Sequence, residues 1–238
     1  MPSMTERLLY LPLSDGAALA DRVVLDEATV QRAAGLKGPR QSSYLAGRAL
    51  LALALRHFYG ISQLPELVLE VHGRPRFADP ALPDFSLSHS GEALVLLLGD
   101  GPLGVDIELH KPRRNLPKLM AAVLGEAERG WLAEQGEASQ LASFYRLWTL
   151  REAIVKASGR GIAGFSRIAI EPQTRTVRTD EVAGGSLLCA ELGSYSLALC
   201  LPGADACWPE GFCCDGQGQL APLPLRLHPG YRLLPPGA

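Results

Sequence analysis

The sequence predicts an α+β protein made of two similar halves. Three observations support this prediction: a helical segment at residues 40–59, a second at residues 140–158, and a similar order of short strands after each. With 47% hydrophobic and 20% charged residues, the chain can bury a sizeable core. The offset of about 100 residues between matching segments favours an internal duplication. A chance recurrence is the alternative, because a helix followed by antiparallel strands is common in α+β proteins.

The first half is built around the helix expected at residues 40–59. Tyr44, Leu51 and Leu55 fall near one helical stripe, and Gly60 ends the pattern. Three β-like runs follow it, at residues 67–71, 85–88 and 93–98, and the last two are joined by a turn at Ser90-Gly91. We therefore expect a helix followed by an antiparallel sheet.

The second half repeats this order. Its helix, at residues 140–158, stops at Gly159, and the β-like runs lie at residues 168–170, 186–191 and 195–199. The chain from Pro202 onward is rich in Gly and Pro, so we expect an irregular C-terminal tail. The expected division is an N-terminal half of residues 1–103 and a C-terminal half of residues 104–238.

Composition excludes several classes of protein. The formal net charge of −2 predicts no general attraction to nucleic acid or to an anionic membrane. Apolar runs such as residues 93–98 are much shorter than the roughly 20 residues of a membrane-spanning helix. Glu6 and Arg7 interrupt the segment where a secretory signal needs an apolar core, and the five cysteines include no CxxC pair. We expect a cytoplasmic protein with reduced thiols.

The strongest local motif is Gly104-Val105-Asp106-Ile107-Glu108. In a strand, the side chains of Asp106 and Glu108 point to the same face, about 7 Å apart. Two like charges so placed are tolerated on a solvated face or around a cation. Carboxylates suit Mg²⁺, which completes its octahedron with water and substrate phosphate. Taken alone, this pair is better explained as the polar face of an edge strand.

A second motif lies within the second helix, in the sequence Trp148-Thr149-Leu150-Arg151-Glu152-Ala153-Ile154-Val155-Lys156. Glu152 and Lys156 are four residues apart and share the stripe of Trp148. An exposed Glu–Lys pair at this spacing adds only about 0.2–0.5 kcal/mol to helix stability. Placement on a core-facing stripe instead favours a functional site, in which Glu152 joins the metal or accepts a proton and Lys156 meets phosphate.

Two further segments carry polar groups suited to phosphate. Phe85–Gly91 reads FSLSHSG, in which Ser88, His89 and a glycine turn offer hydrogen-bond donors. It lacks the first glycine of a G-x-S-x-G elbow, so a nucleophilic serine is not expected. His72–Arg76 reads HGRPR, a short basic turn, and Arg40 and Arg48 add cations on the first helix. The sequence contains no P-loop and no G-x-G-x-x-G fingerprint.

Taken together, these motifs resemble those of the 4′-phosphopantetheinyl transferases. The family pattern is (I/V)-G-(I/V)-D-x-E followed some forty residues later by (F/W)-x-x-(K/R)-E-(A/S)-x-x-K. Both parts match here, with Arg151 where lysine is commoner. The resemblance covers roughly residues 40–165, and the length of 238 residues agrees with the long, monomeric surfactin-synthetase-activating type.

The resemblance implies a fold of two α/β halves related by a pseudo-twofold axis, with coenzyme A in the cleft between them. It implies that Asp106, Glu108 and Glu152 coordinate Mg²⁺ and that Lys156 neutralises charge or protonates the departing 3′,5′-ADP. The coenzyme A contacts that it implies are Ser88 and His89 at phosphate groups, Arg40 near the 3′-phosphate, and Gly73 and Arg74 around the adenine. The family has further basic coenzyme A contacts upstream of the position of Arg40. Arg32 and Lys37 are the candidates here, but the motif does not show which of them corresponds to which contact.

The implied reaction is transfer of phosphopantetheine to a serine of an apo acyl or peptidyl carrier protein. A basic loop, His110–Arg114, precedes an apolar stripe of Leu116, Leu119, Met120 and Val123, which suits a small acidic partner. A solvated loop and an ordinary amphipathic helix explain these residues equally well. Two other functions use the same residues: a Mg²⁺-dependent phosphohydrolase, and a non-catalytic module that binds coenzyme A or the carrier.

Overall fold

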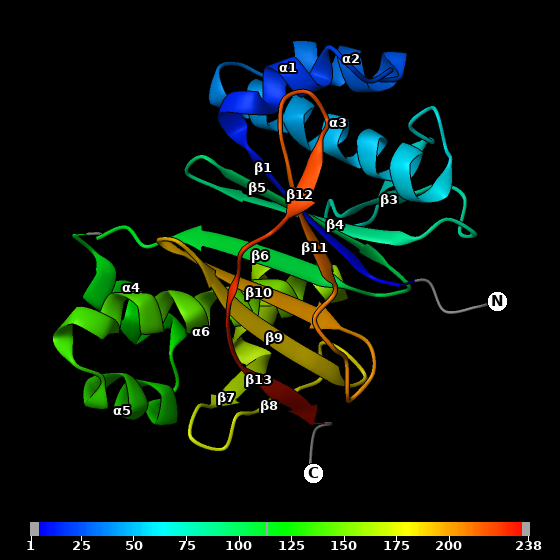
Figure 1. The fold of residues 1–238 in the computed structure, drawn as a ribbon. Helices are drawn as coiled ribbons and strands as arrows, with labels where there is room; N and C mark the ends of the chain where they lie inside the picture. The colour runs from blue at the N-terminus through cyan, green and yellow to red at the C-terminus, as the bar shows by residue number, and fades with distance from the viewer. Residues whose placement is uncertain (1–4, 113, 235–238) are drawn as a thin grey trace. The chain divides into compact units, whose positions relative to one another are not determined.

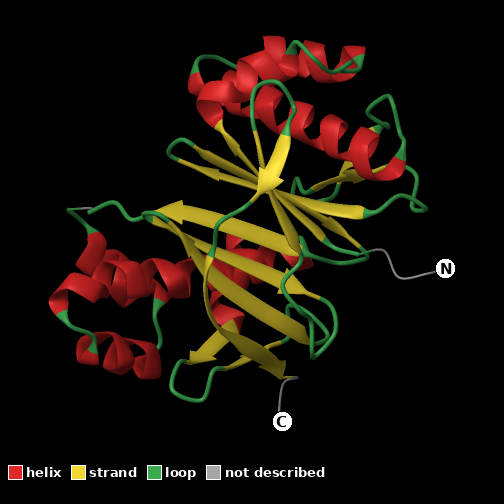
Figure 2. Cartoon of the chain, in the orientation of Figure 1, coloured by secondary structure: helices red, strands yellow, loops and turns green. Residues whose placement is uncertain are grey.

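The chain divides into two compact units in a computed structural model that describes residues 5–112 and 114–234 (Figure 1). Unit 1 contains the described residues of 1–70, 75–100 and 209–224, and unit 2 contains those of 71–74, 101–208 and 225–238. The units differ from the expected division at residues 103/104 in residues 71–74, 101–103 and 209–224, and the division into functional halves stays a prediction. Both units carry helices and strands, as an α+β protein requires (Figure 2).

Unit 1 is organised by helix α3 (Pro39–Tyr59). Pro39 lies in its first turn, and Gly60 ends it in the left-handed conformation with a φ of 69°. Helices α1 (Gly16–Ala20) and α2 (Glu27–Ala34) pack against α3 on the side away from the sheet (Figure 1). The central residues of α3, 46–55, are therefore buried on every side, and not along the single stripe that the sequence indicates.

The sheet of unit 1 has the strand order β12-β11-β1-β5-β4. Its strands are β1 (Arg7–Pro12), β4 (Asp84–Ser90), β5 (Ala93–Gly99), β11 (Glu210–Cys214) and β12 (Leu220–Pro222). A short 3₁₀ turn, η1 (Leu13–Asp15), follows β1, and a separate hairpin joins β2 (Leu67–Leu69) to β3 (Pro75–Phe77). Leu9, Leu96 and Leu98 of the sheet and Leu50 and Leu55 of α3 belong to one apolar core.

Unit 2 contains a sheet with the order β6-β10-β9-β13-β8-β7, packed against helix α6. Its strands are β6 (Gly104–Leu109), β7 (Ile168–Glu171), β8 (Thr176–Thr179), β9 (Gly185–Leu192), β10 (Tyr195–Leu201) and β13 (Arg226–Leu234). Its helices are α4 (Leu116–Val123), α5 (Glu126–Glu134), α6 (Glu137–Ser158) and the 3₁₀ helix η2 (Ile162–Arg167). Gly159 ends α6 in the left-handed conformation, as the sequence predicts.

The same order of elements occurs in both units. In unit 1 the chain runs through β1, α3, β2, β3, β4 and β5, and in unit 2 through β6, α6, β7, β8, β9 and β10. The first strand of each series pairs antiparallel with the last one, β1 with β5 and β6 with β10. The predicted recurrence of helix, strand and hairpin is therefore present. The pseudo-twofold axis stays a prediction.

Two expectations about the fold are wrong. The tail after Pro202 is not irregular, because it supplies β11 and β12 to the sheet of unit 1 and β13 to that of unit 2. The sheets are also not wholly antiparallel, since β11 runs parallel to β1 and β13 runs parallel to β8. A bulge between His228 and Tyr231 accommodates the Pro229-Gly230 pair that obscures the β13 pattern in the sequence.

All five cysteines have free thiols. Cys213 and Cys214 lie in β11 and not in a loop, so their side chains point to opposite faces of the strand. Burial raises the pKa of the Cys214 thiol to about 12, which keeps this thiol protonated and unreactive. Over the described ranges of the chain, no helix is long and apolar enough to cross a membrane.

Candidate functional site

The contact between β6 and α6 depends on Gly104. A Cβ atom at this position would lie 2.0 Å from the carbonyl oxygen of Ala153 and 2.6 Å from the amide nitrogen of Ala157. No side chain fits at such distances, so only glycine lets the strand approach the helix backbone this closely. The glycine of the G-V-D-I-E motif therefore fixes the distance between the strand that carries Asp106 and the helix that carries Glu152 and Lys156.

The close approach brings charged side chains from both elements together. Asp106 is buried, and Glu108, two residues further along the same face of β6, is half-buried. The Lys156 ammonium of α6 donates a hydrogen bond to Asp106, with 2.7 Å between Nζ and Oδ1. Thus the two motifs, about fifty residues apart in sequence, meet at a charge-assisted hydrogen bond.

Glu152 shares this environment. The pKa of its carboxyl is raised from 4.5 to about 7, chiefly by burial and also by the negative charges of Asp106 and Glu108, whereas the positive charge of Lys156 lowers it. The half-buried Glu152 therefore lies within electrostatic reach of both acidic residues of β6. A carboxyl with a pKa near neutrality between other carboxylates is a common feature of functional sites.

The donor set suits a hard divalent cation. Asp106, Glu108 and Glu152 offer only oxygen atoms, which Mg²⁺ prefers, and a cation among them would relieve their mutual repulsion. In the side-chain arrangement of the described residues, no three His, Cys, Asp or Glu side chains gather closely enough to enclose a metal. The predicted metal ligands thus share one electrostatic environment, and their coordination stays a prediction.

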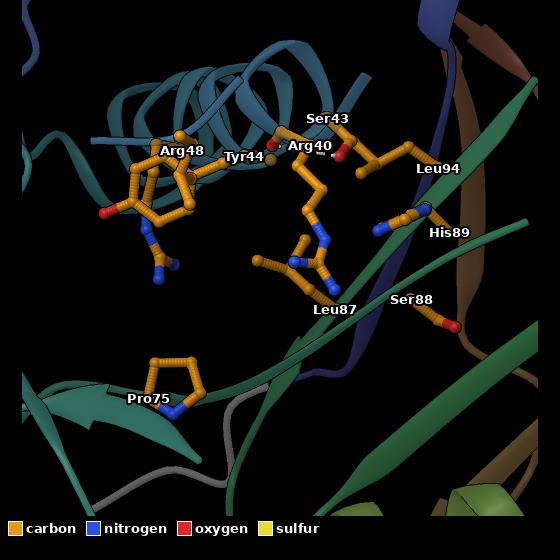
Figure 3. A pocket seen from close by; sticks show the side chains of 11 residues that line it. Arg40, Ser43, Tyr44, Arg48, Pro75, Leu87, Ser88, His89 and Leu94 are labelled. Atoms are coloured by element: carbon orange, nitrogen blue, oxygen red, sulfur yellow. Dashed lines mark hydrogen bonds between the residues drawn. The ribbon is translucent and has the colours of Figure 1, made fainter. Parts of the chain in front are cut away.

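A pocket of about 350 Å³ lies in unit 1 beside the N-terminal half of α3. Arg40 and Arg48 from the helix and His89 from β4 line it (Figure 3). The first turn of α3 contains no acidic residue, and its N-cap, Gly38, offers no side chain, so no local negative charge offsets the positive end of the helix dipole. This combination suits a phosphate group.

Ser88 and His89 lie differently in this pocket. Successive side chains of a strand point to opposite faces, and Figure 3 shows the His89 ring directed toward Arg40 while the Ser88 hydroxyl points away. His89 is exposed, whereas Ser88 is buried. The structure therefore brings Arg40 and His89 together, and Ser88 contributes to the pocket wall from the opposite face.

Arg48, which the sequence indicates only as a further cation on the first helix, is a functional candidate in the structure. It is only 8% exposed, and its guanidinium carbon lies 5.1 Å from the centre of the Tyr44 ring. Its Nε and Nη1 atoms have no hydrogen-bond partner among the described residues. Arginine is rarely buried unless it is paired, so these nitrogens are suited to bind an anion. A signal in the sequence could have indicated this role: successive members of the set Arg40, Tyr44 and Arg48 are four residues apart, which places all three on one face of the helix.

A second pocket of about 460 Å³ shares Tyr44 and Arg48 with the first. Its wall also contains Arg32 of α2 and Thr29, which is fixed by hydrogen bonds to the N-cap residue Asp26. Of the two upstream cations considered from the sequence, Arg32 therefore lies beside Arg48. The remaining predicted contacts, Gly73 and Arg74, lie in the turn between β2 and β3, where Gly73 has a φ of 85° and Arg74 donates to the Leu103 carbonyl at 3.2 Å.

The predicted partner surface is only partly described. Arg113 lies outside the described residues, whereas Lys111 and Arg114 are exposed. The apolar side chains of α4 pack against the core of unit 2 and remain half-buried. Helix α4 is thus amphipathic. A role in partner binding for the exposed residues beside it, Lys111 and Arg114, stays a prediction.

Comparison with known proteins agrees with these motifs. Residues 102–200, which include β6 and α6, match the family model of the 4′-phosphopantetheinyl transferase superfamily. The chain is 38% identical to 4′-phosphopantetheinyl transferase AcpT of Salmonella typhimurium over 167 residues, which cover 70% of this chain and 79% of that protein. It is 35% identical to 4′-phosphopantetheinyl transferase AcpT of Escherichia coli K12 over 192 residues, which cover 76% of this chain and 90% of that protein.

A more distant relative is the 4′-phosphopantetheinyl transferase of Bacillus subtilis, which is 30% identical over 122 residues, or 50% of this chain and 53% of that protein. The AcpT matches extend over most of both chains, well beyond the two motifs. The residues that these motifs contribute also meet in unit 2, where Lys156 contacts Asp106. This chain therefore belongs to the 4′-phosphopantetheinyl transferase superfamily.

Proposed function

We propose that this protein transfers the 4′-phosphopantetheine group of coenzyme A to a serine hydroxyl of an apo acyl or peptidyl carrier protein, in a Mg²⁺-dependent reaction that releases 3′,5′-ADP. One observation carries the proposal beyond family membership. Glu152, with a pKa raised to about 7, is coupled to Asp106 and Glu108 beside Lys156. A site that had lost its activity would be under no constraint to retain all four groups.

Unit 2 supplies the chemistry in this proposal. Asp106, Glu108 and Glu152 would hold Mg²⁺, whose positive charge would stabilise the negative charge that develops in phosphoryl transfer. Glu152 accepts the proton of the attacking serine, directly or through water, because a carboxylate positioned beside the reacting hydroxyl can act as a general base. A bond forms between the serine oxygen and phosphorus while the bond to 3′,5′-ADP breaks, and Lys156 neutralises or protonates this leaving group.

Unit 1 supplies contacts to coenzyme A. Arg40, His89 and the N-terminus of α3 suit its 3′-phosphate, and Arg48 adds a buried cation from the same pocket. Ser88 of unit 1 serves a phosphate group, and Gly73 and Arg74, which belong to unit 2, serve the adenine. These assignments rest on the family resemblance together with the positive charge of the pocket.

The partner in this proposal is a small acidic carrier protein that approaches a monomer of the enzyme. Exposed Lys111 and Arg114 beside α4 provide charge complementarity. Electrostatic steering of this kind increases the association rate and weakens as salt rises.

Intact-protein mass spectrometry tests the proposal. A panel of apo carrier proteins is incubated with the enzyme, coenzyme A and Mg²⁺, and at least one carrier should gain the mass of phosphopantetheine. Release of phosphate from coenzyme A with no gain of carrier mass would instead indicate a phosphohydrolase. Binding of coenzyme A with neither product would indicate a non-catalytic module.

A further inference from the structure

Next to Glu152, the side chain of Arg151 is engaged in a buried ion pair. Its Nη2 atom donates to Oε2 of Glu128 in α5, and both side chains are 1% exposed. The same Glu128 oxygen accepts a hydrogen bond from the Gly125 amide at 2.7 Å, at the start of α5. Arg151 also reaches the carbonyl oxygen of Ile168, 3.5 Å away at the start of β7. One guanidinium thus connects α6 to two other elements of unit 2.

This pair is not explained by stability alone. Moving two charges into the protein interior is costly, and well-packed apolar side chains of similar volume often serve stability as well or better. The pair here is also incompletely satisfied, since Nε and Nη1 of Arg151 and Oε1 of Glu128 have no hydrogen-bond partner among the described residues. A buried polar pair with such a cost calls for another explanation, and fixing one arrangement of the chain is a known one.

The position of Arg151 on α6 shows which arrangement it fixes. Consecutive residues of an α-helix project about 100° apart, so anchoring Arg151 determines the direction in which Glu152 points. On the β6 side of the helix, Lys156 is held to Asp106. Polar contacts on two sides of the same segment of α6 therefore restrict both its rotation about its axis and its sliding along β6.

We propose that Arg151 and Glu128 are positioning residues that orient the Glu152 carboxylate toward those of Asp106 and Glu108. This inference rests on the proposed function, because it assigns the pair a role in assembling the metal ligands of that site. Neither residue touches the reacting groups. Arginine suits the task because its planar guanidinium offers several donors in a fixed geometry, so that one side chain serves both Glu128 and Ile168.

The test uses Mn²⁺ as a probe in place of Mg²⁺, since both favour oxygen ligands. Glu128→Gln keeps the shape of the side chain but removes its charge, and a double variant, Arg151→Met with Glu128→Met, replaces the pair by apolar groups. Glu126→Gln, an exposed carboxyl in the first turn of the same helix, is the matched control. Electron paramagnetic resonance measures Mn²⁺ affinity with and without coenzyme A, and thermal melting and turnover are measured on the same samples.

We expect Glu128→Gln and the double variant to bind Mn²⁺ roughly 10- to 100-fold more weakly, as is typical when groups that orient metal ligands are removed. The affinity of both variants for coenzyme A should stay within about twofold of the wild type. The control Glu126→Gln should match the wild type within about twofold in Mn²⁺ affinity, coenzyme A affinity and turnover. Arg151→Lys keeps the positive charge but loses the planar donor geometry, so its Mn²⁺ affinity should lie between those of the wild type and the double variant. If the double variant does not fold, Glu128→Gln decides the question.

Wild-type Mn²⁺ affinity and turnover in folded Glu128→Gln would overturn the proposal. So would a loss of Mn²⁺ affinity that disappears at a temperature where the variant is fully folded, because the pair would then serve stability only. If the wild-type enzyme modifies no carrier, the proposed function fails instead. The Mn²⁺ affinities of the same variants would still decide whether the pair orients Glu152.

Discussion

Gly104 and Ala153 lie in closer contact than any side chain at position 104 would allow, since a Cβ atom there would be 2.0 Å from the Ala153 carbonyl oxygen. Gly104 therefore sets the distance between β6 and α6, and with it the contact between Asp106 and Lys156. The motif glycine is required by packing against the helix backbone and not by an unusual φ.

Gly104→Ala should separate strand and helix and destabilise the protein by about 1–3 kcal/mol, the usual range for overpacking a core. Turnover should fall further than the fraction of folded protein, because the Asp106–Lys156 contact is lengthened. Gly130→Ala in α5 is the control: a Cβ atom there would meet no atom of the described residues within 4 Å, so it should be neutral or slightly stabilising. Urea unfolding and turnover measure both effects, and wild-type behaviour of Gly104→Ala would refute this account of the motif.

Glu152→Gln should leave coenzyme A bound but lower turnover by roughly 10²–10⁴-fold, because it removes a proton acceptor and a metal ligand while keeping the shape of the side chain. Calorimetry with coenzyme A and mass spectrometry of the carrier separate binding from transfer. Unchanged turnover would refute the role of Glu152.

Glu152 should also make stability depend on pH when metal is removed with a chelator. Its pKa is raised from 4.5 to about 7 in the folded chain, so between these values the folded state holds a proton that the unfolded chain has released. The free energy of unfolding should therefore decrease as pH rises through this window. Glu152→Gln should remove this decrease and be more stable than the wild type at pH 8 by about 1–2 kcal/mol, a figure discounted for partial solvent exposure. Equal pH profiles for the two proteins would contradict the assignment.

Arg48→Ala should raise the dissociation constant of coenzyme A by roughly 10- to 100-fold, since hydrogen bonds to charged groups contribute about 1.5–3 kcal/mol. Arg56→Ala, an exposed arginine on the same helix, is the control and should change it less than twofold. Isothermal titration calorimetry with coenzyme A, in the absence of carrier protein, measures both dissociation constants. Equal effects of the two substitutions would remove Arg48 from the site.

Arg113→Glu combined with Arg114→Glu should raise KM for the carrier several-fold at low salt, with kcat little changed, because steering acts on association. The effect should shrink as ionic strength increases. Arg22→Glu combined with Arg56→Glu, at two exposed arginines of unit 1, makes the same change in net charge and is the control. An unchanged KM would favour a simple solvated loop.

Local signals predicted the elements that carry the chemistry. Helices α3 and α6 end at Gly60 and Gly159 as expected, since both glycines adopt the left-handed conformation that stops a helix. The family prediction is also confirmed, because motif spacing depends only on the order of residues along the chain. The hairpins β4–β5 and β9–β10 are predictable from the sequence because each pairs two neighbouring segments across a short turn.

Features that depend on distant partners were not predictable in this way. Strand β11 pairs with β1, some two hundred residues earlier, and no local pattern reveals such pairing. The burial of Arg48 similarly depends on how the elements of unit 1 pack around α3, and its spacing from Arg40 shows only that the two share a helix face. The Arg151–Glu128 pair joins two helices and appears in the sequence only as charged residues at ordinary helical positions.

The central claim, that three carboxylates hold one divalent ion, is tested most directly by crystals grown with coenzyme A and Mn²⁺. Anomalous scattering should show one Mn²⁺ bound by Asp106, Glu108 and Glu152 and by oxygens of the pyrophosphate. Mn²⁺ bound elsewhere, or bound while the Glu152 carboxylate points away from it, would contradict the account.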